Sequence, residues 1–319
     1  MTQRATIKGF DFTSSPRRKK PITCGRGVLA GDSLQTEGID CLTDFEQFEN
    51  ALQEPGPWIA GFDFPFSLPK IFVEQAGWPL RWEDMVWRLP ALGQSAFEST
   101  IRSYCAANSP GNKHPRRRTD VVANSRSPLM LDYTPVGKMF FQGSWRLANA
   151  GLCIAPCRLC DDNRIAVEVY PALVARRWIQ RLSYKSDTKR KQTANQAEQR
   201  RIIVQGLRGD RPREAYGCRV VASDRFWDQC ISDPGADLLD AVLCCVQAAW
   251  AYSQRGNGYG IPSDADRLEG WIIDPSTAQR AQFAFGPNWR LNSICFQRVS
   301  ILAKTSVLAE DEATSSRET

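Results

Sequence analysis

The sequence predicts a mixed α/β domain: an antiparallel meander plus parallel strands, flanked by helices and carrying a helical insertion. Strand-like runs come first in the 319-residue chain, and helical and strand-like segments then alternate. The stretch at about 68–150 is helical, irregular and rich in Trp and Arg, which indicates an insertion or lid. We expect residues 1–302 to form a single domain and the polar tail 303–319 to be disordered.

The first three strands form the predicted meander. Ile7, Gly9 and Asp11 occupy alternate positions, which places them on one face of the opening strand. ITCGRGVLA and SLQTEGIDCL are the next two strands, separated by glycine-containing breaks.

A helix and a fourth strand follow. TDFEQFENALQ is predicted to be a helix with Thr43 as its N-cap. WIAGFDFPF then repeats the GFDF tetrapeptide of the first strand, so Gly61 and Asp63 take the same facing pattern. Both aspartates are therefore expected near strand ends, on faces that carry glycine.

The second half of the chain alternates strand and helix. RIAVEVYPAL is a strand that offers Glu168 near its end, and KRKQTANQAEQRRIIVQGL is a basic amphipathic helix. DPGADLLDAVLCCVQAAWAYSQ shows the clearest apolar stripe of any helix, with Asp233 expected as its N-cap. EGWIIDP is predicted to close the sheet.

Composition points to a globular cytoplasmic protein. Hydrophobic residues make up 42% of the chain and charged residues 24%, which is ordinary for a folded domain. No run approaches the length of a membrane span, and the first residues lack the apolar core of a signal peptide, so we expect no membrane partner. The odd count of 11 cysteines at irregular spacing favours reduced thiols.

Basic residues are clustered, and the net charge is +6. Such clusters attract polyanions, nucleic acid above all. We therefore predict a nucleic-acid partner, without distinguishing DNA from RNA or predicting an oligomeric state. KSDTKRK at 185–191 is a third cluster beside the two that supply the predicted contacts. The predicted nucleic-acid-binding residues are Arg17, Arg18, Lys19, Lys20, Arg116, Arg117 and Arg118.

Five carboxylates are candidates for a shared catalytic and metal site: Asp11, Asp63, Glu168, Asp237 and Asp240. An unpaired buried carboxylate must shift its pKa, find a partner or bind a metal. The last two lie three residues apart on one helix face, where they repel each other unless they share a cation. Carboxylate oxygens suit Mg²⁺ or Mn²⁺, and two such ions can promote hydrolysis of a phosphodiester.

Each carboxylate also has a structural interpretation. Asp11 and Asp63 could cap turns, Glu168 could face solvent, and Asp237 could complement a helix dipole. Their occurrence together, at the ends of two GFDF strands, favours the metal pocket.

Several segments resemble, in their order along the chain, the motifs of the family called domain of unknown function 429. They are GFDFTSSPRRKKP, IAGFDFPFSLP, VEVYPAL and DLLDAVLCCVQAAWA followed by EGWI. That family is described as predicted nucleases with an RNase H-like fold. The resemblance implies a central five-stranded mixed sheet and acidic metal ligands at the five carboxylate positions above. Their order is also similar to that of Holliday-junction resolvases.

The resemblance has one departure. Ribonuclease H has its glutamate on the helix between the two aspartate-bearing strands, whereas Glu168 comes later and on a strand. Cleavage of RNA–DNA hybrids is therefore not predicted. The leading hypothesis is a Mg²⁺- or Mn²⁺-dependent nuclease that uses two metals. The alternatives are an actin-like phosphotransferase, suggested by the turn DFTSS, and a non-catalytic nucleic-acid-binding protein of the same fold.

Overall fold

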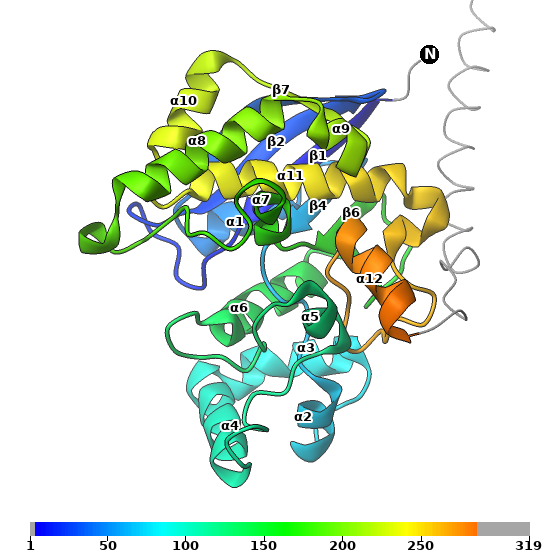
Figure 1. Cartoon of the computed structure of the whole chain (residues 1–319). Helices are drawn as coiled ribbons and strands as arrows, with labels where there is room; N and C mark the ends of the chain where they lie inside the picture. Colours follow the sequence, from blue (N-terminus) through cyan, green and yellow to red (C-terminus); the bar gives the residue numbers. More distant parts are fainter. Residues whose placement is uncertain (1–3, 286–319) are drawn as a thin grey trace, which may run out of the picture.

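The computed structural model describes residues 4–285, in which a seven-stranded sheet is covered by helices on both faces (Figure 1). The sheet has the order β5-β6-β4-β1-β2-β3-β7. This confirms the mixed α/β class and is consistent with an RNase H-like fold. The strands are β1 (Arg4–Asp11), β2 (Ile22–Ala30), β3 (Ser33–Leu42), β4 (Trp58–Phe62), β5 (Cys153–Ala155), β6 (Arg164–Glu168) and β7 (Arg219–Val221).

Strand pairing follows the predicted meander and then changes direction. β2 pairs antiparallel with both β1 and β3. On the other side of β1, β4 pairs parallel to β1, and β6 pairs parallel to β4. The three-residue strands β5 and β7 extend the two edges and were not predicted. The segment predicted to close the sheet contributes one isolated bridge, between Ile272 and Glu168.

The helices fall into three groups along the chain. The first lies before β4, the second fills the predicted insertion between β4 and β5, and the third follows β6. Figure 1 shows the insertion gathered on one side of the sheet, with α11 running across the strands. The α-helices are α1 (Phe45–Leu52), α2 (Lys70–Gln75), α3 (Trp82–Leu92), α4 (Gln94–Ala107), α5 (Arg118–Ala123), α6 (Val136–Asn149), α7 (Pro171–Ile179), α8 (Ala194–Arg208), α9 (Arg211–Tyr216), α10 (Asp224–Ser232), α11 (Asp237–Ser253) and α12 (Pro275–Phe285), and the 3-10 helices are η1 (Lys189–Lys191) and η2 (Arg255–Gly260).

A row of three glycines lets α11 lie directly on the sheet. Gly9 pairs with Gly25 on one side and with Gly61 on the other, so the row crosses three adjacent strands. A β-carbon on Gly9 would lie 2.5 Å from the backbone nitrogen of Cys245, and one on Gly61 would lie 2.8 Å from the carbonyl oxygen of Cys244. Real β-carbons do not approach backbone atoms this closely, so the close contact of helix and sheet depends on glycine.

The opposite face of the sheet carries aromatic side chains. Phe10 and Phe62, the second residues of the two GFDF tetrapeptides, stack with ring centroids 4.6 Å apart, and Phe48 of α1 meets them edge-on. Such ring pairs stabilise a core beyond the area that they bury. The GFDF repeat therefore has a structural explanation: its glycine admits α11, its phenylalanine fills the other face, and its aspartate lies at the strand end.

Two helix starts differ from the prediction by a few residues. The N-cap of α1 is Asp44, which accepts from the backbone N–H of Gln47, and Thr43 lies one residue earlier. α11 begins at Asp237 because residues 233–236 form a turn, in which Asp233 accepts from the N–H groups of Gly235 and Leu238. Within residues 4–285 no helix is both long enough and apolar enough to cross a membrane. The predicted tail 303–319 and the predicted domain end at 302 lie outside the described residues.

Candidate functional site

Four of the five predicted carboxylates converge where α11 begins over the ends of β1 and β4. Asp11 ends β1, Asp63 follows β4 directly, and Asp237 and Asp240 lie in the first turn of α11. The carboxylate of Asp11 is close enough to feel the negative charge of the other three. Because α11 presents its N-terminus here, its dipole favours anionic groups at this place. We call these four residues the carboxylate cluster.

Asp11 and Asp63 are the unpaired members of the cluster. Asp11 is 7% exposed and Asp63 is partly exposed, and neither side chain makes a hydrogen bond or ion pair with any part of the chain between residues 4 and 285. Burial raises the pKa of Asp11 well above its usual range, and the neighbouring carboxylates raise it further against the opposing effect of Lys185. Both groups thus lack the compensation that a buried charge needs.

Burial raises the pKa of Asp63 to about 7, with Lys185 opposing the rise and Asp240 adding to it. In the unfolded chain the pKa of this carboxyl is near its ordinary value of 3.8, so the folded state binds its proton more tightly. The stability due to this proton is therefore fully present below about pH 4 and is lost as the pH rises to about 7. The side chain of asparagine does not titrate in this range, so we expect Asp63→Asn to lack this loss of stability between pH 4 and 7.

This prediction is tested by urea unfolding of wild type and Asp63→Asn in EDTA at several pH values. The difference in free energy of unfolding should grow in favour of the variant between pH 4 and 7 and stay level above that range. A difference independent of pH would show that Asp63 is not held in this environment.

Asp240 is paired with two side chains from the segment before α8. It is fully buried; the hydroxyl of Tyr184 donates to its Oδ1 at 2.6 Å, and the ammonium of Lys185 forms an ion pair with its Oδ2. Burial raises the pKa of Asp240, and Lys185 opposes that rise. The side chain of Lys185 is 41% exposed, so this ammonium enters the cluster from solvent.

A second lysine, Lys20, enters the cluster from the turn between β1 and β2. Its ammonium lies 2.6 Å from Oδ1 of Asp237 and 2.8 Å from Oδ1 of Asp187. Burial opposes its charge, but Asp11 and Asp237 more than compensate and raise the pKa of Lys20. Lys20 was predicted to contact nucleic acid, and in the structure it joins two basic segments at the edge of the cluster.

The cluster has more carboxylates than ammonium groups. Its four carboxylates, when ionised, face the two ammonium groups of Lys20 and Lys185, which leaves an excess of two negative charges. Within the described part of the chain, no three His, Cys, Asp or Glu side chains are already arranged as a metal site. An ion that bound here would therefore have to draw the carboxylates together and displace at least one lysine.

Glu168, the fifth predicted carboxylate, makes its bonds elsewhere. It ends β6 and is 2% exposed, and its Oε1 and Oε2 accept from the guanidinium of Arg117 at 2.5 and 2.8 Å. Oε2 also accepts from the backbone N–H of Phe66 at 2.9 Å. Both oxygens are thus committed within the protein, which leaves Glu168 poorly placed to bind a metal.

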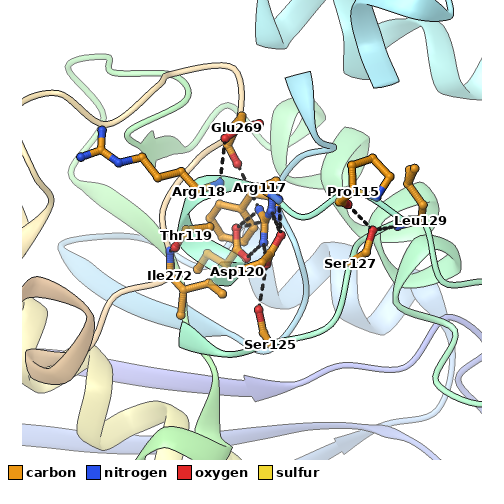
Figure 2. A network of polar contacts seen from close by, with 12 residues as sticks. Pro115, Arg117, Arg118, Thr119, Asp120, Ser125, Ser127, Leu129, Glu269 and Ile272 are labelled. Carbon is orange, nitrogen blue, oxygen red and sulfur yellow. Dashed lines mark hydrogen bonds and ion pairs between the residues drawn. The ribbon is translucent and has the colours of Figure 1, made fainter. Parts of the chain in front are cut away.

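Arg117 is the centre of a buried network that ties the insertion to the rest of the fold (Figure 2). Its Nε and Nη2 donate to the carboxylate of Asp120 at 2.9 and 2.8 Å, and its Nη1 donates to the carbonyl of Glu269 at 3.0 Å. Although burial opposes the charge, Asp120 and Glu168 raise the pKa of Arg117. The expected role of Arg117 in nucleic-acid binding needs correction, because this side chain is 1% exposed and its donors are engaged.

The other predicted basic residues lie nearer the surface. Arg17, Arg18 and Lys19 are exposed in the turn after β1, next to Lys20. In the second group, Arg116 is exposed and Arg118 is ion-paired with Asp264 at 2.8 Å. The third basic cluster of the sequence, which supplies Lys185, continues into η1, where Lys189, Arg190 and Lys191 are exposed.

Sequence reasoning missed Tyr184 and Lys185 as members of the site. The basic run that contains Lys185 was recognised only as a surface cluster, and no local pattern marks which of its lysines turns inward. It also missed Gly25, the third glycine of the row. The glycine in ITCGRG was visible, but only the strand register shows that it lies opposite Gly9.

Comparison with known families gives one match. Residues 23–267 match the model of a family described as "Protein of unknown function (DUF429)". Comparisons with curated proteins and with solved structures give no match.

Proposed function

Because the chain belongs to the family of unknown function DUF429, whose description gives no activity, we propose from the geometry of the site that it is a Mg²⁺- or Mn²⁺-dependent nuclease. One observation carries this proposal. Two unpaired carboxylates, Asp11, which is buried, and Asp63, which is partly exposed, lie at adjacent strand ends inside a cluster that has more carboxylates than ammonium groups. A hard dication would supply the missing positive charge.

The donor set fits such an ion. Asp11 and Asp63 would hold it, with Asp240 and Asp237 as further oxygen ligands once their lysines move aside. A divalent ion supplies charge stabilisation for the attacking and leaving oxygens of a phosphodiester. Glu168 stays outside this ligand set, because its two oxygens are bonded to Arg117 and Phe66.

The surroundings of the cluster fit a polyanionic substrate. The ion pair between Lys20 and Asp187 joins the turn after β1 to the segment before η1, and both of these segments carry exposed cations. Phosphate contacts of this kind position a nucleic acid without reading its sequence. In this proposal Lys20 and Lys185 exchange their carboxylate partners for a phosphate and so orient the substrate.

The proposal is tested by titrating Mn²⁺ into the protein at pH 7.5 and following the melting temperature, together with cleavage of single- and double-stranded DNA and RNA. We expect Mn²⁺ to raise the melting temperature of wild type, since it binds the folded state alone and relieves repulsion there. Asp11→Asn and Asp63→Asn should lose both the shift and the cleavage.

The matched control is Asp228→Asn, which changes an exposed aspartate on α10. It should keep the Mn²⁺ shift and the cleavage of wild type. Mn²⁺ shifts of the same size in Asp63→Asn and Asp228→Asn, or cleavage that persists in both Asp11→Asn and Asp63→Asn, would refute the assignment.

A second function, nucleic-acid binding without catalysis, is favoured by the placement of the two lysines. Lys20 and Lys185 already neutralise half of the cluster, and Glu168 is tied to Arg117. A protein of this kind would bind nucleic acid with an affinity that falls steeply with salt, but its melting temperature would not respond to Mn²⁺. The titration above separates the two functions.

A further inference from the structure

A pocket of about 260 Å³ is lined by Tyr184, whose hydroxyl bonds to the carboxylate cluster. It is formed between α7, the end of α5 and the segment that follows α7. Its volume is close to the lower end for ligand pockets, which suits one small group rather than a length of polymer. The residues that matter for its chemistry are Asn124, Ala172, Arg176, Gln180, Arg181 and Tyr184.

The pocket and the cluster share one wall. Tyr184 lines the pocket, and its hydroxyl donates to Asp240 of the cluster. Arg176 is held at the pocket by two further bonds, from Nη1 to the carbonyl of Ala123 at 3.2 Å and from Nη2 to the hydroxyl of Tyr170 at 3.1 Å. The charge of Asp63 in turn reaches Tyr170. The pocket is thus connected to the cluster through the side chains of Tyr184 and Tyr170.

Polar groups at the pocket have unused hydrogen-bonding capacity. The side chains of Asn124, Gln180 and Arg181 are exposed, and they make no hydrogen bond or ion pair with any residue in the range 4–285. The remaining lining includes apolar side chains, among them Ala172 and Ile179, together with the ring of Tyr184. Amide donors and acceptors, a guanidinium and an apolar, partly aromatic wall are the groups that bind a base and its phosphate.

We propose that this pocket is a subsite for one nucleotide unit of the substrate, next to the phosphodiester held at the carboxylate cluster. The amides of Asn124 and Gln180 bond the edge of the base, the base packs on the apolar wall, and Arg181 pairs with its phosphate. The subsite deepens the proposed nuclease function and rests on it for the position of the scissile bond. Its affinity for a nucleotide does not need the metal.

The test is calorimetric binding of AMP, GMP, CMP and UMP, one at a time, to the full chain in EDTA. Wild type should bind at least one of them saturably, and Arg181→Gln should weaken that binding about tenfold, since a charged hydrogen bond is lost. Asn124 has φ of 51°, so Asn124→Gly keeps this backbone conformation while it removes the amide and should also weaken binding. Ala172→Trp should abolish it by filling the pocket.

Arg225→Gln is the control, because it removes the same charge from an exposed position on α10. It should bind nucleotide as wild type does. The proposal is overturned if no mononucleotide binds saturably, if Arg181→Gln and Arg225→Gln bind equally well, or if inorganic phosphate binds as tightly as the nucleotide.

The two proposals fail separately. Nucleotide binding that depends on Arg181, without any Mn²⁺-dependent cleavage, would keep the subsite and reject the nuclease. The opposite result would keep the nuclease and reject the subsite. In that case Asp63→Asn would abolish cleavage, Arg181→Gln and Ala172→Trp would cleave with the KM of wild type, and no nucleotide would bind in EDTA.

Discussion

Replacing Gly9 by valine is expected to lower the free energy of unfolding by about 3 kcal/mol or more. The first side-chain carbon alone would lie 2.5 Å from the nitrogen of Cys245 and 2.8 Å from the β-carbon of Cys244, and would meet the carbonyl of Ala241 more closely still. Because these are mostly backbone atoms, no rotamer change relieves the contact. α11 would have to lift from the sheet, and the carboxylate cluster would lose its geometry. Urea unfolding measures the effect.

The matched control is Gly38→Val in β3, where an added β-carbon would meet nothing within 4 Å. Valine is favoured in strands, so this variant should be as stable as wild type or more stable. If the two glycine variants were destabilised equally, the close contact between α11 and β1 would not be the reason for the glycine.

The strands and their faces could be predicted because the information is local. The alternation of Ile7, Gly9 and Asp11 and its repetition in the second GFDF segment fix which side chains share a face. The strong apolar stripe of α11 likewise predicts a buried helix. That α11 lies on these glycines is a tertiary fact, which depends on the register of three strands and was not predicted.

The acidic half of the site could also be predicted, whereas its basic half could not. Asp11 and Asp63 stand out because a carboxylate at the end of an apolar strand is unusual. Lys185 is one lysine in a run of several, and nothing periodic separates it from its exposed neighbours. Its position is set by Tyr184, whose buried ring and hydroxyl bring the segment against Asp240.

Glu168 shows how a side chain can be placed correctly from the sequence while its bonding partner goes unpredicted. It does lie at the end of a strand, as the sequence predicts, and the structure shows that this strand pairs parallel to β4. Its charge, however, is compensated by Arg117, which lies 51 residues earlier in the chain. Arg117 belongs to a basic run that was predicted to bind nucleic acid at the surface. Composition alone could not distinguish the one buried arginine of that run from its exposed neighbour Arg116, because burial is decided by the packing of the insertion.

Replacing Arg117 by leucine is expected to lower the free energy of unfolding by about 3–5 kcal/mol at pH 7, the range for a buried ion pair that loses one partner. The variant leaves the carboxylates of Asp120 and Glu168 buried without their cation. Burial already raises the pKa of Glu168 against the opposing effect of Arg117, so without Arg117 this carboxyl would bind a proton still more readily in the folded state than in the unfolded one. The destabilisation should therefore shrink as the pH falls from 7 to 5. Urea unfolding at the two pH values checks this.

A second substitution tests two points: why Arg117→Leu is destabilised, and whether Glu168 is a ligand of the proposed metal ion. Glu168→Gln in the Arg117→Leu background should recover part of the stability, because it removes one of the two stranded charges. In the wild-type background, Glu168→Gln should keep the Mn²⁺-induced rise in melting temperature that Asp63→Asn loses. If Glu168→Gln abolished that rise and Arg117→Leu did not destabilise the protein, Glu168 would belong with the metal and not with the arginine.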